Sequence, residues 1–246
     1  MFDATLIFIG AVFVLAGFVK GVIGLGLPTI SMGLLAMGLP PIRAAAILIL
    51  PSLVTNVWQM FAGPALTVVI RRLWPMMLTI CLGTWIGIGL MTGANARFGT
   101  AFLGIALSLY AMTGLAALRL SIPKGWEPVL SPTVGAATGL IAAATGVFVI
   151  PAVAHLQALG SEKEELIQAL GLSFTVSTIA LAINVGVEGG LQVSMANDTL
   201  VALALACVGM WVGQTIRLRI SPTAFRTWFF LGLLVLGVYL AARSLG

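Results

Sequence analysis

Apolar residues fill this chain in long runs, and the short stretches between the runs hold most of the charged and turn-forming residues. A helix needs about 20 apolar residues to cross the hydrocarbon core of a bilayer, and several of the runs approach that length. The pattern therefore predicts a protein of membrane-spanning helices. The apolar runs cover residues 4–20, 27–38, 44–62, 73–93, 98–118, 132–146, 147–159, 166–187, 199–216 and 226–243.

Two of these runs, 27–38 and 147–159, are too short to cross alone at about 1.5 Å of rise per residue. Each follows a stretch rich in glycine and proline, at 17–28 and at 139–151. Gly and Pro weaken or end a helix, and broken backbone inside a membrane is tolerated where it is buried in protein or lines a wet cavity. We therefore expect two broken or re-entrant hairpins whose breaks form the walls of a transport site.

The second half of the sequence repeats the first. The motif of Cys81, Gly83, Trp85 and Gly87 recurs with the same spacing as Cys207, Gly209, Trp211 and Gly213. The two Gly/Pro stretches fall in the same relative order. We predict an all-α polytopic membrane protein of two related halves, each a broken hairpin plus three transmembrane helices. Residues 1–120 would form the first repeat, 121–131 a linker loop and 132–246 the second repeat.

Composition agrees with a membrane protein and explains the basic net charge. The 246 residues are 60% hydrophobic and 8% charged, against about 25% charged in soluble domains. Placing loops 62–72, 119–131, 160–165 and 217–226 in the cytoplasm puts basic residues there in excess, as membrane topology favours. Equivalent loops of the two halves then lie on opposite sides, which predicts an inverted repeat. The inner set is Arg71, Arg72, Arg119, Lys124, Lys163, Arg217, Arg219 and Arg226, and the outer set is Arg43, Arg97 and Arg243.

Lys20 lies within the first Gly/Pro stretch, and an ionisable side chain inside a membrane is a functional-site hypothesis. The alternative is that its ammonium snorkels to the interface. Pro28 and Pro151 would begin the two short helices, whose N-terminal amides and dipoles attract anions. A proline kink with no ligand is the alternative there. These breaks contribute Lys20, Gly21, Gly24, Gly26, Pro28, Thr29, Thr145, Gly146 and Pro151 to the predicted anion site.

Two further helices carry polar residues in apolar surroundings. Ser52 with Asn56, and Ser173 with Ser177, are spaced four residues apart and so share a helix face. We add all four to the predicted site, while hydrogen bonding between helices without any substrate is an equal alternative. His155, the one histidine of the sequence, can couple protons to transport or, in the favoured interpretation, only pack and hydrogen-bond.

Known catalytic motifs, nucleotide-binding glycine motifs and carboxylate pairs are missing from the predicted spans. We therefore expect no enzyme activity, no cofactor and no metal. The expected partners are a small anionic substrate, protons and the lipid bilayer. The sequence is compatible with a homodimer, and we expect no nucleic acid as a partner.

The stretch from Ala16 to Pro28, together with residues 34–46, resembles the first half of the TauE/SafE family of sulfite and sulfonate exporter-like permeases. The second stretch departs from that pattern, because Gly146 and Pro151 enclose Val-Phe-Val-Ile where the family has a run of glycines. The resemblance implies a secondary transporter of an organosulfur, sulfite, sulfonate or carboxylate anion in the bacterial inner membrane. An anion channel, or a membrane subunit without its own transport cycle, is the alternative.

Overall fold

The computed structural model describes residues 4–92, 95–116, 121–123 and 125–245. Within these ranges the chain forms helices and no strand. The first half contains α1 (Ala4–Ile23), α2 (Leu27–Leu35), α3 (Pro41–Met60), α4 (Leu66–Ile86) and α5 (Asn95–Leu115). The second half contains α6 (Glu127–Thr145), α7 (Ala152–Ala158), α8 (Lys163–Val187), the short 3₁₀ helix η1 (Val193–Met195), α9 (Ala196–Ile216) and α10 (Pro222–Leu245).

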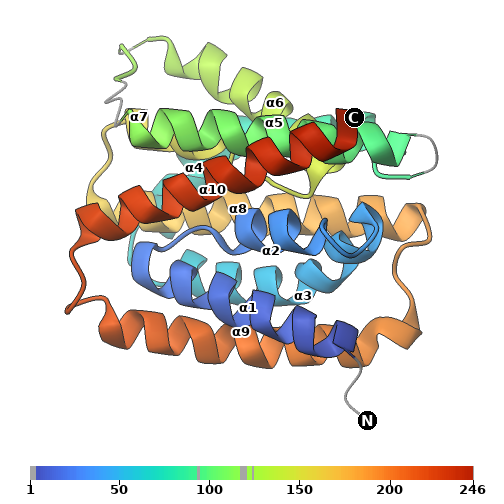
Figure 1. The fold of residues 1–246 in the computed structure, drawn as a ribbon. Coiled ribbons are helices and arrows are strands. Elements are labelled where there is room, and N and C mark those ends of the chain that lie inside the picture. The colour runs from blue at the N-terminus through green and yellow to red at the C-terminus, as the bar shows by residue number, and fades with distance from the viewer. Residues whose placement is uncertain (1–3, 93–94, 117–120, 124, 246) are drawn as a thin grey trace.

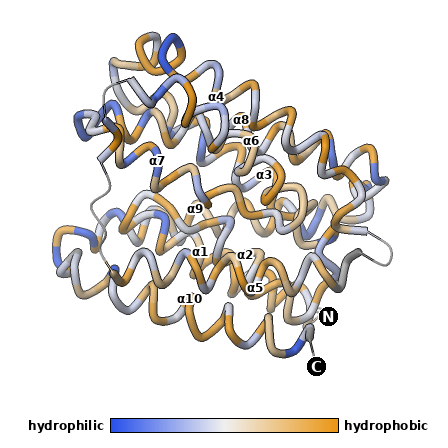
Figure 2. The backbone as a smooth tube through the Cα atoms, turned by 90° about the horizontal axis from the view of Figure 1, so that it is seen from above, coloured by the Kyte–Doolittle hydropathy of each residue, from blue (hydrophilic) through white to orange (hydrophobic). Residues whose placement is uncertain are grey.

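The long helices lie lengthwise beside one another, and the start of α1 and the end of α10 lie at the same end of the bundle (Figure 1). Among the described residues, eight helices are long and apolar enough to cross a membrane, whereas α2 and α7 are short. Hydrophilic residues gather toward the ends of the helices, and hydrophobic ones follow their lengths (Figure 2). The chain is a multi-pass membrane protein, as its hydrophobic pattern predicted.

The first break lies later in the chain than the sequence indicated. Helix α1 continues through Lys20 to Ile23, so the prediction that the break begins at Gly17 was wrong. The chain leaves the helix at Gly24 and Gly26, whose φ angles of 80° and 108° favour glycine. Helix α2 then doubles back along α1. Helical packing overrides the weak propensity of the two earlier glycines, Gly17 and Gly21.

The second break follows α6, which ends at Thr145 and is capped by Gly146 at a φ angle of 70°. Residues 147–151 then lead into α7 with Pro151 at its N-cap. The start of α6 also differs from the prediction. Glu127 begins the helix inside the segment that we assigned to the linker, because Pro128 fits the first helical turn, where no amide donor is needed.

Contacts between the two halves occur in matching pairs, in which each helix is replaced by its counterpart from the other half. Helix α1 packs on α9, and its counterpart α6 packs on α4, while α3 packs on α8 and α5 on α10. The first two contacts are close backbone contacts at glycine. Gly17 lies against the backbone of Ala206, and Gly139 lies against the backbone of Ile80. The glycine pairs of these helices therefore serve packing, as small residues do in membrane bundles.

Ion pairs and hydrogen bonds join the loops that the charge pattern assigned to a common side. At one end Arg72 of α4 donates to Glu127 at the start of α6 (2.6 and 2.8 Å) and to Glu165 of α8 (3.2 Å). At the other end Arg43 of α3 pairs with Asp198 of α9 at 3.1 Å. Asp3, Arg119 and Lys124 lie outside the described residues, as does the side chain of Arg97.

Candidate functional site

Lys20 points into the bundle from the last turn of α1. The residue is 5% exposed. Its Nζ donates to Thr55 Oγ1 at 3.0 Å and to Asn56 Oδ1, both near the C-terminal end of α3. The ammonium therefore does not snorkel to the membrane interface. Two of the three donors of the ammonium have hydrogen-bond partners within the described part of the chain, and the third has none there.

The contacts of Lys20 continue through α3 to α8. Asn56 Nδ2 donates to Thr178 Oγ1 at 3.3 Å, and the Thr178 hydroxyl donates to Phe174 O at 2.6 Å. The Thr55 hydroxyl donates to Pro51 O at 2.7 Å, so its oxygen is free to accept from Lys20. We call Lys20, Thr55, Asn56 and Thr178 the Lys20 cluster. The cluster spans three helices, and its partner side chains on α3 and α8 orient the ammonium of α1, since each partner is itself held in place.

Three buried hydroxyls on the same two helices, α3 and α8, have no hydrogen-bond partner. They belong to Ser52 (1% exposed), Ser173 (0%) and Ser177 (0%). Ser52 lies one turn before Asn56 on α3, and Ser177 precedes Thr178 on α8. A buried polar group without a partner costs about 1–3 kcal/mol, which a bound ligand or water removes. These serines are the part of the predicted site with unused hydrogen-bonding capacity.

The first break brings the other predicted residues near α1 and α10. Pro28 is the second residue of α2, where its missing amide costs nothing. The Thr29 hydroxyl donates to Gly26 O at 2.8 Å. A Cβ at Gly26 would meet Val19 and Phe229, so this turn is packed against side chains of α1 and α10. Gly21 is not in the break, and it faces the backbone of α9 at Met210.

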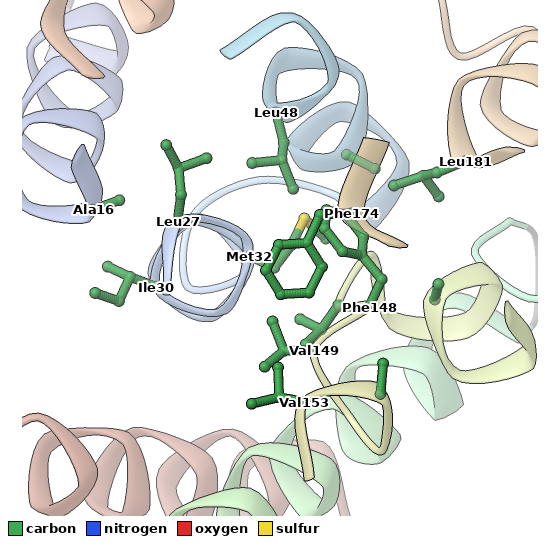
Figure 3. Packing of buried hydrophobic residues seen from close by; sticks show 14 of the residues in the cluster. Ala16, Leu27, Ile30, Met32, Leu48, Phe148, Val149, Val153, Phe174 and Leu181 are labelled. Carbon is green, nitrogen blue, oxygen red and sulfur yellow. The ribbon is translucent and has the colours of Figure 1, made fainter. Parts of the chain in front are cut away.

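The second break meets α2 through apolar side chains. Met32 lies beside Phe148 and Phe174 in Figure 3, and the rings of Phe148 and Phe174 are 5.5 Å apart. Gly146 faces Met32, and the Thr145 hydroxyl is used locally, donating to Ile141 O (2.7 Å) and accepting from Val147 N (3.1 Å). The contacts that join the two break regions are hydrophobic, whereas the polar groups gather on α1, α3 and α8.

His155 of α7 lies in a separate polar contact. Its Nε2 and Ser131 Oγ of α6 are 2.8 Å apart, and His155 is 6% exposed. Sequence reasoning did not single out Ser131, although it lies at the polar start of an otherwise apolar helix. It also omitted Thr55 and Thr178 from the site. Each of the two threonines adjoins a predicted site residue, and that adjacency was the available signal.

The residue types present limit what the site can hold. Over the described part of the chain, the histidine, cysteine, aspartate and glutamate side chains form no group of three able to bind a metal ion. A buried ammonium flanked by hydroxyls and an amide instead suits an anion with several oxygen acceptors.

Comparison with known protein families identifies the family of this chain. A protein-family model described as "Sulfite exporter TauE/SafE" matches residues 9–240, which is nearly the whole chain. No curated protein and no solved structure matches the sequence or the fold.

Proposed function

Because this chain belongs to the TauE/SafE family of sulfite exporters, we propose that it is a secondary transporter of a small organosulfur, sulfite, sulfonate or carboxylate anion. The family consists of membrane transporters, so the protein is not an enzyme. Its proposed location is the inner membrane of a bacterium, with the Arg72 end of the bundle in the cytoplasm, as the distribution of basic residues favours.

The observation that carries this proposal is the enclosure of Lys20 without a carboxylate partner. In the described part of the chain, the ion pairs involve Arg43 and Arg72 at the helix ends, and none involves Lys20. An unpaired ammonium is costly inside a protein, and more so inside a membrane. A small anion bound against its free N–H and the serine hydroxyls would neutralise that charge.

The two ion-pair clusters support an alternating-access cycle between inverted halves. Arg72 and Asp198 each lie nine residues before the cysteine of their repeat. Their partners, Glu165 and Arg43, are each the third residue of α8 and α3. The same contact thus occurs once at each end of the bundle with its charges exchanged. We propose that rocking one half against the other separates one pair while the other stays closed.

A flux assay on protein reconstituted into liposomes tests the transport cycle. We expect uptake of labelled sulfite or methanesulfonate to saturate, and internal unlabelled anion to accelerate it by about tenfold through counterflow, since an empty carrier returns more slowly than a loaded one. A linear, non-saturating flux without counterflow would identify an anion channel. Protein-free liposomes and liposomes with heat-unfolded protein set the background.

Proton coupling through His155 is a second part of the proposal. The ring joins α6 to α7 across the second break, so a change in its protonation would act on both helices. We expect His155→Gln to lower pH-gradient-driven accumulation by about tenfold and to keep counterflow within about twofold. Equal losses in both assays would show a structural contact with Ser131 and contradict proton coupling.

A further inference from the structure

One side chain that can carry a positive charge, that of Lys20, lies inside the described part of the bundle. Of the Lys, Arg, Asp and Glu side chains that the structure describes, Lys20 alone is enclosed, at 5% exposure. The paired groups at the helix ends are more exposed, at 40% and 20% for Arg43 and Asp198 and at 33% for Arg72. Among the described residues, the interior therefore contains one basic side chain of this kind and no carboxylate to offset its charge.

We propose that this site is selective for anions with one negative charge, so that the loaded site is electrically neutral. The inference rests on the proposed transport function and adds the charge class of the substrate. A monoanion at Lys20 leaves no net charge in the low-dielectric interior, where an uncompensated charge is strongly disfavoured. A dianion at the same place leaves one negative charge without a partner. The serine hydroxyls donate dipoles and not full charges, so they do not replace a second cation.

The described polar groups around Lys20 include no second cation to provide that compensation. Asn56 and Thr55 accept from its Nζ, and Thr178 accepts from the Asn56 amide. His155, the other enclosed basic side chain among the described residues, bonds to Ser131 of α6 and makes no hydrogen bond to the Lys20 cluster. The charge of the loaded site is therefore the charge of Lys20 plus the charge of the anion.

The net charges of the loaded and the empty site also predict how flux depends on membrane potential. A loaded neutral site moves across the potential without electrical work, while the empty site moves with the charge of Lys20. Exchange of monoanions, which uses loaded states only, is then independent of the potential. Net efflux, which requires the empty site to return, depends on it. A unit charge crossing the whole field would change a rate by up to roughly 50-fold per 100 mV.

The test uses two tetrahedral sulfur oxyanions whose charges stay fixed near neutral pH, methanesulfonate (one) and sulfate (two). In proteoliposomes with wild-type protein, we expect sulfate to compete with labelled methanesulfonate at least about 30-fold more weakly than unlabelled methanesulfonate does. Methanesulfonate exchange should vary by less than about 1.5-fold when a potassium gradient with valinomycin sets potentials of either sign. Because both measurements use wild-type protein, neither depends on a variant that fails to fold.

A charge-adding variant tests the cause of the selectivity. Ser177→Lys places a second cation beside the cluster. We expect it to strengthen competition by sulfate, relative to competition by unlabelled methanesulfonate, by about tenfold or more. Ser177→Gln is the uncharged control. Equal competition by sulfate, or methanesulfonate exchange that changes severalfold with potential, would overturn the monoanion proposal while leaving transport intact. Absence of any anion exchange by wild-type protein would instead overturn the proposed function.

Discussion

Lys20→Met is expected to reduce anion flux by at least about 100-fold and to leave the folded bundle intact. Removing one partner of a buried charge interaction costs about 3–5 kcal/mol, and each 1.4 kcal/mol is about tenfold in binding. Methionine has a similar length and no charge. The variant loses the hydrogen bonds to Thr55 and Asn56, but it also loses the cost of burying an ammonium. Counterflow of labelled methanesulfonate measures the flux, and thermal unfolding in detergent measures the stability.

Lys163 supplies the matched control. It lies at the exposed start of α8, and together with Lys20 it makes up the lysines of the described chain. Lys163→Met should retain flux within about twofold, since an exposed charge contributes little. Lys20→Glu should be as inactive as Lys20→Met, because it replaces attraction by repulsion. Flux at the wild-type level in Lys20→Met, with normal folding, would remove the lysine from the transport site and the anion site with it.

The hydrophobic pattern was sufficient to predict that this is a membrane protein and that two of its helices are short. A run of about 20 apolar residues has few alternatives to a spanning helix, and α2 and α7 are short, as runs 27–38 and 147–159 predicted. The charge pattern likewise placed on a common side the segments that Arg72 joins in the structure, and on the opposite side those that Arg43 joins. These features are readable because they depend on local composition, length and the cost of placing charges in lipid.

The sequence did not predict where the first helix break begins or which residues contact the predicted site. Gly17 and Gly21 have poor helix propensity, and only the approach of α9 explains why the helix continues through them. The approach of Met32 of α2 to Gly146 at the second break was also not predictable from the sequence, because both breaks were expected to form the walls of an anion site. The inverted relation of the two halves, the anion site and the proton role of His155 stay predictions.

Gly139→Ala is expected to destabilise the bundle by more than about 2 kcal/mol, because overpacking a close contact costs about 1–3 kcal/mol or more. Gly139 of α6 faces α4, where a Cβ would lie closer than 3.0 Å to Ile80 O and Thr84 N. Both are backbone atoms inside a helix, so no side-chain rotation relieves the overlap. The helices must separate, which also weakens the hydrogen bond from Thr84 Oγ1 to Gly139 O (3.2 Å). Thermal unfolding in detergent should show a lower midpoint.

Gly232→Ala is the control that separates this contact from the intrinsic effect of the substitution. Gly232 lies in α10, and a Cβ there meets no atom within 4 Å. Alanine favours a helix over glycine by about 1 kcal/mol, so Gly232→Ala should hold or raise the unfolding midpoint while Gly139→Ala lowers it. The two midpoint shifts are expected to have opposite signs because the same Gly→Ala change is made in a tightly packed and in an open environment. If both variants shift the midpoint in the same direction by the same amount, helix propensity governs Gly139, and close contact between α4 and α6 does not hold the bundle together.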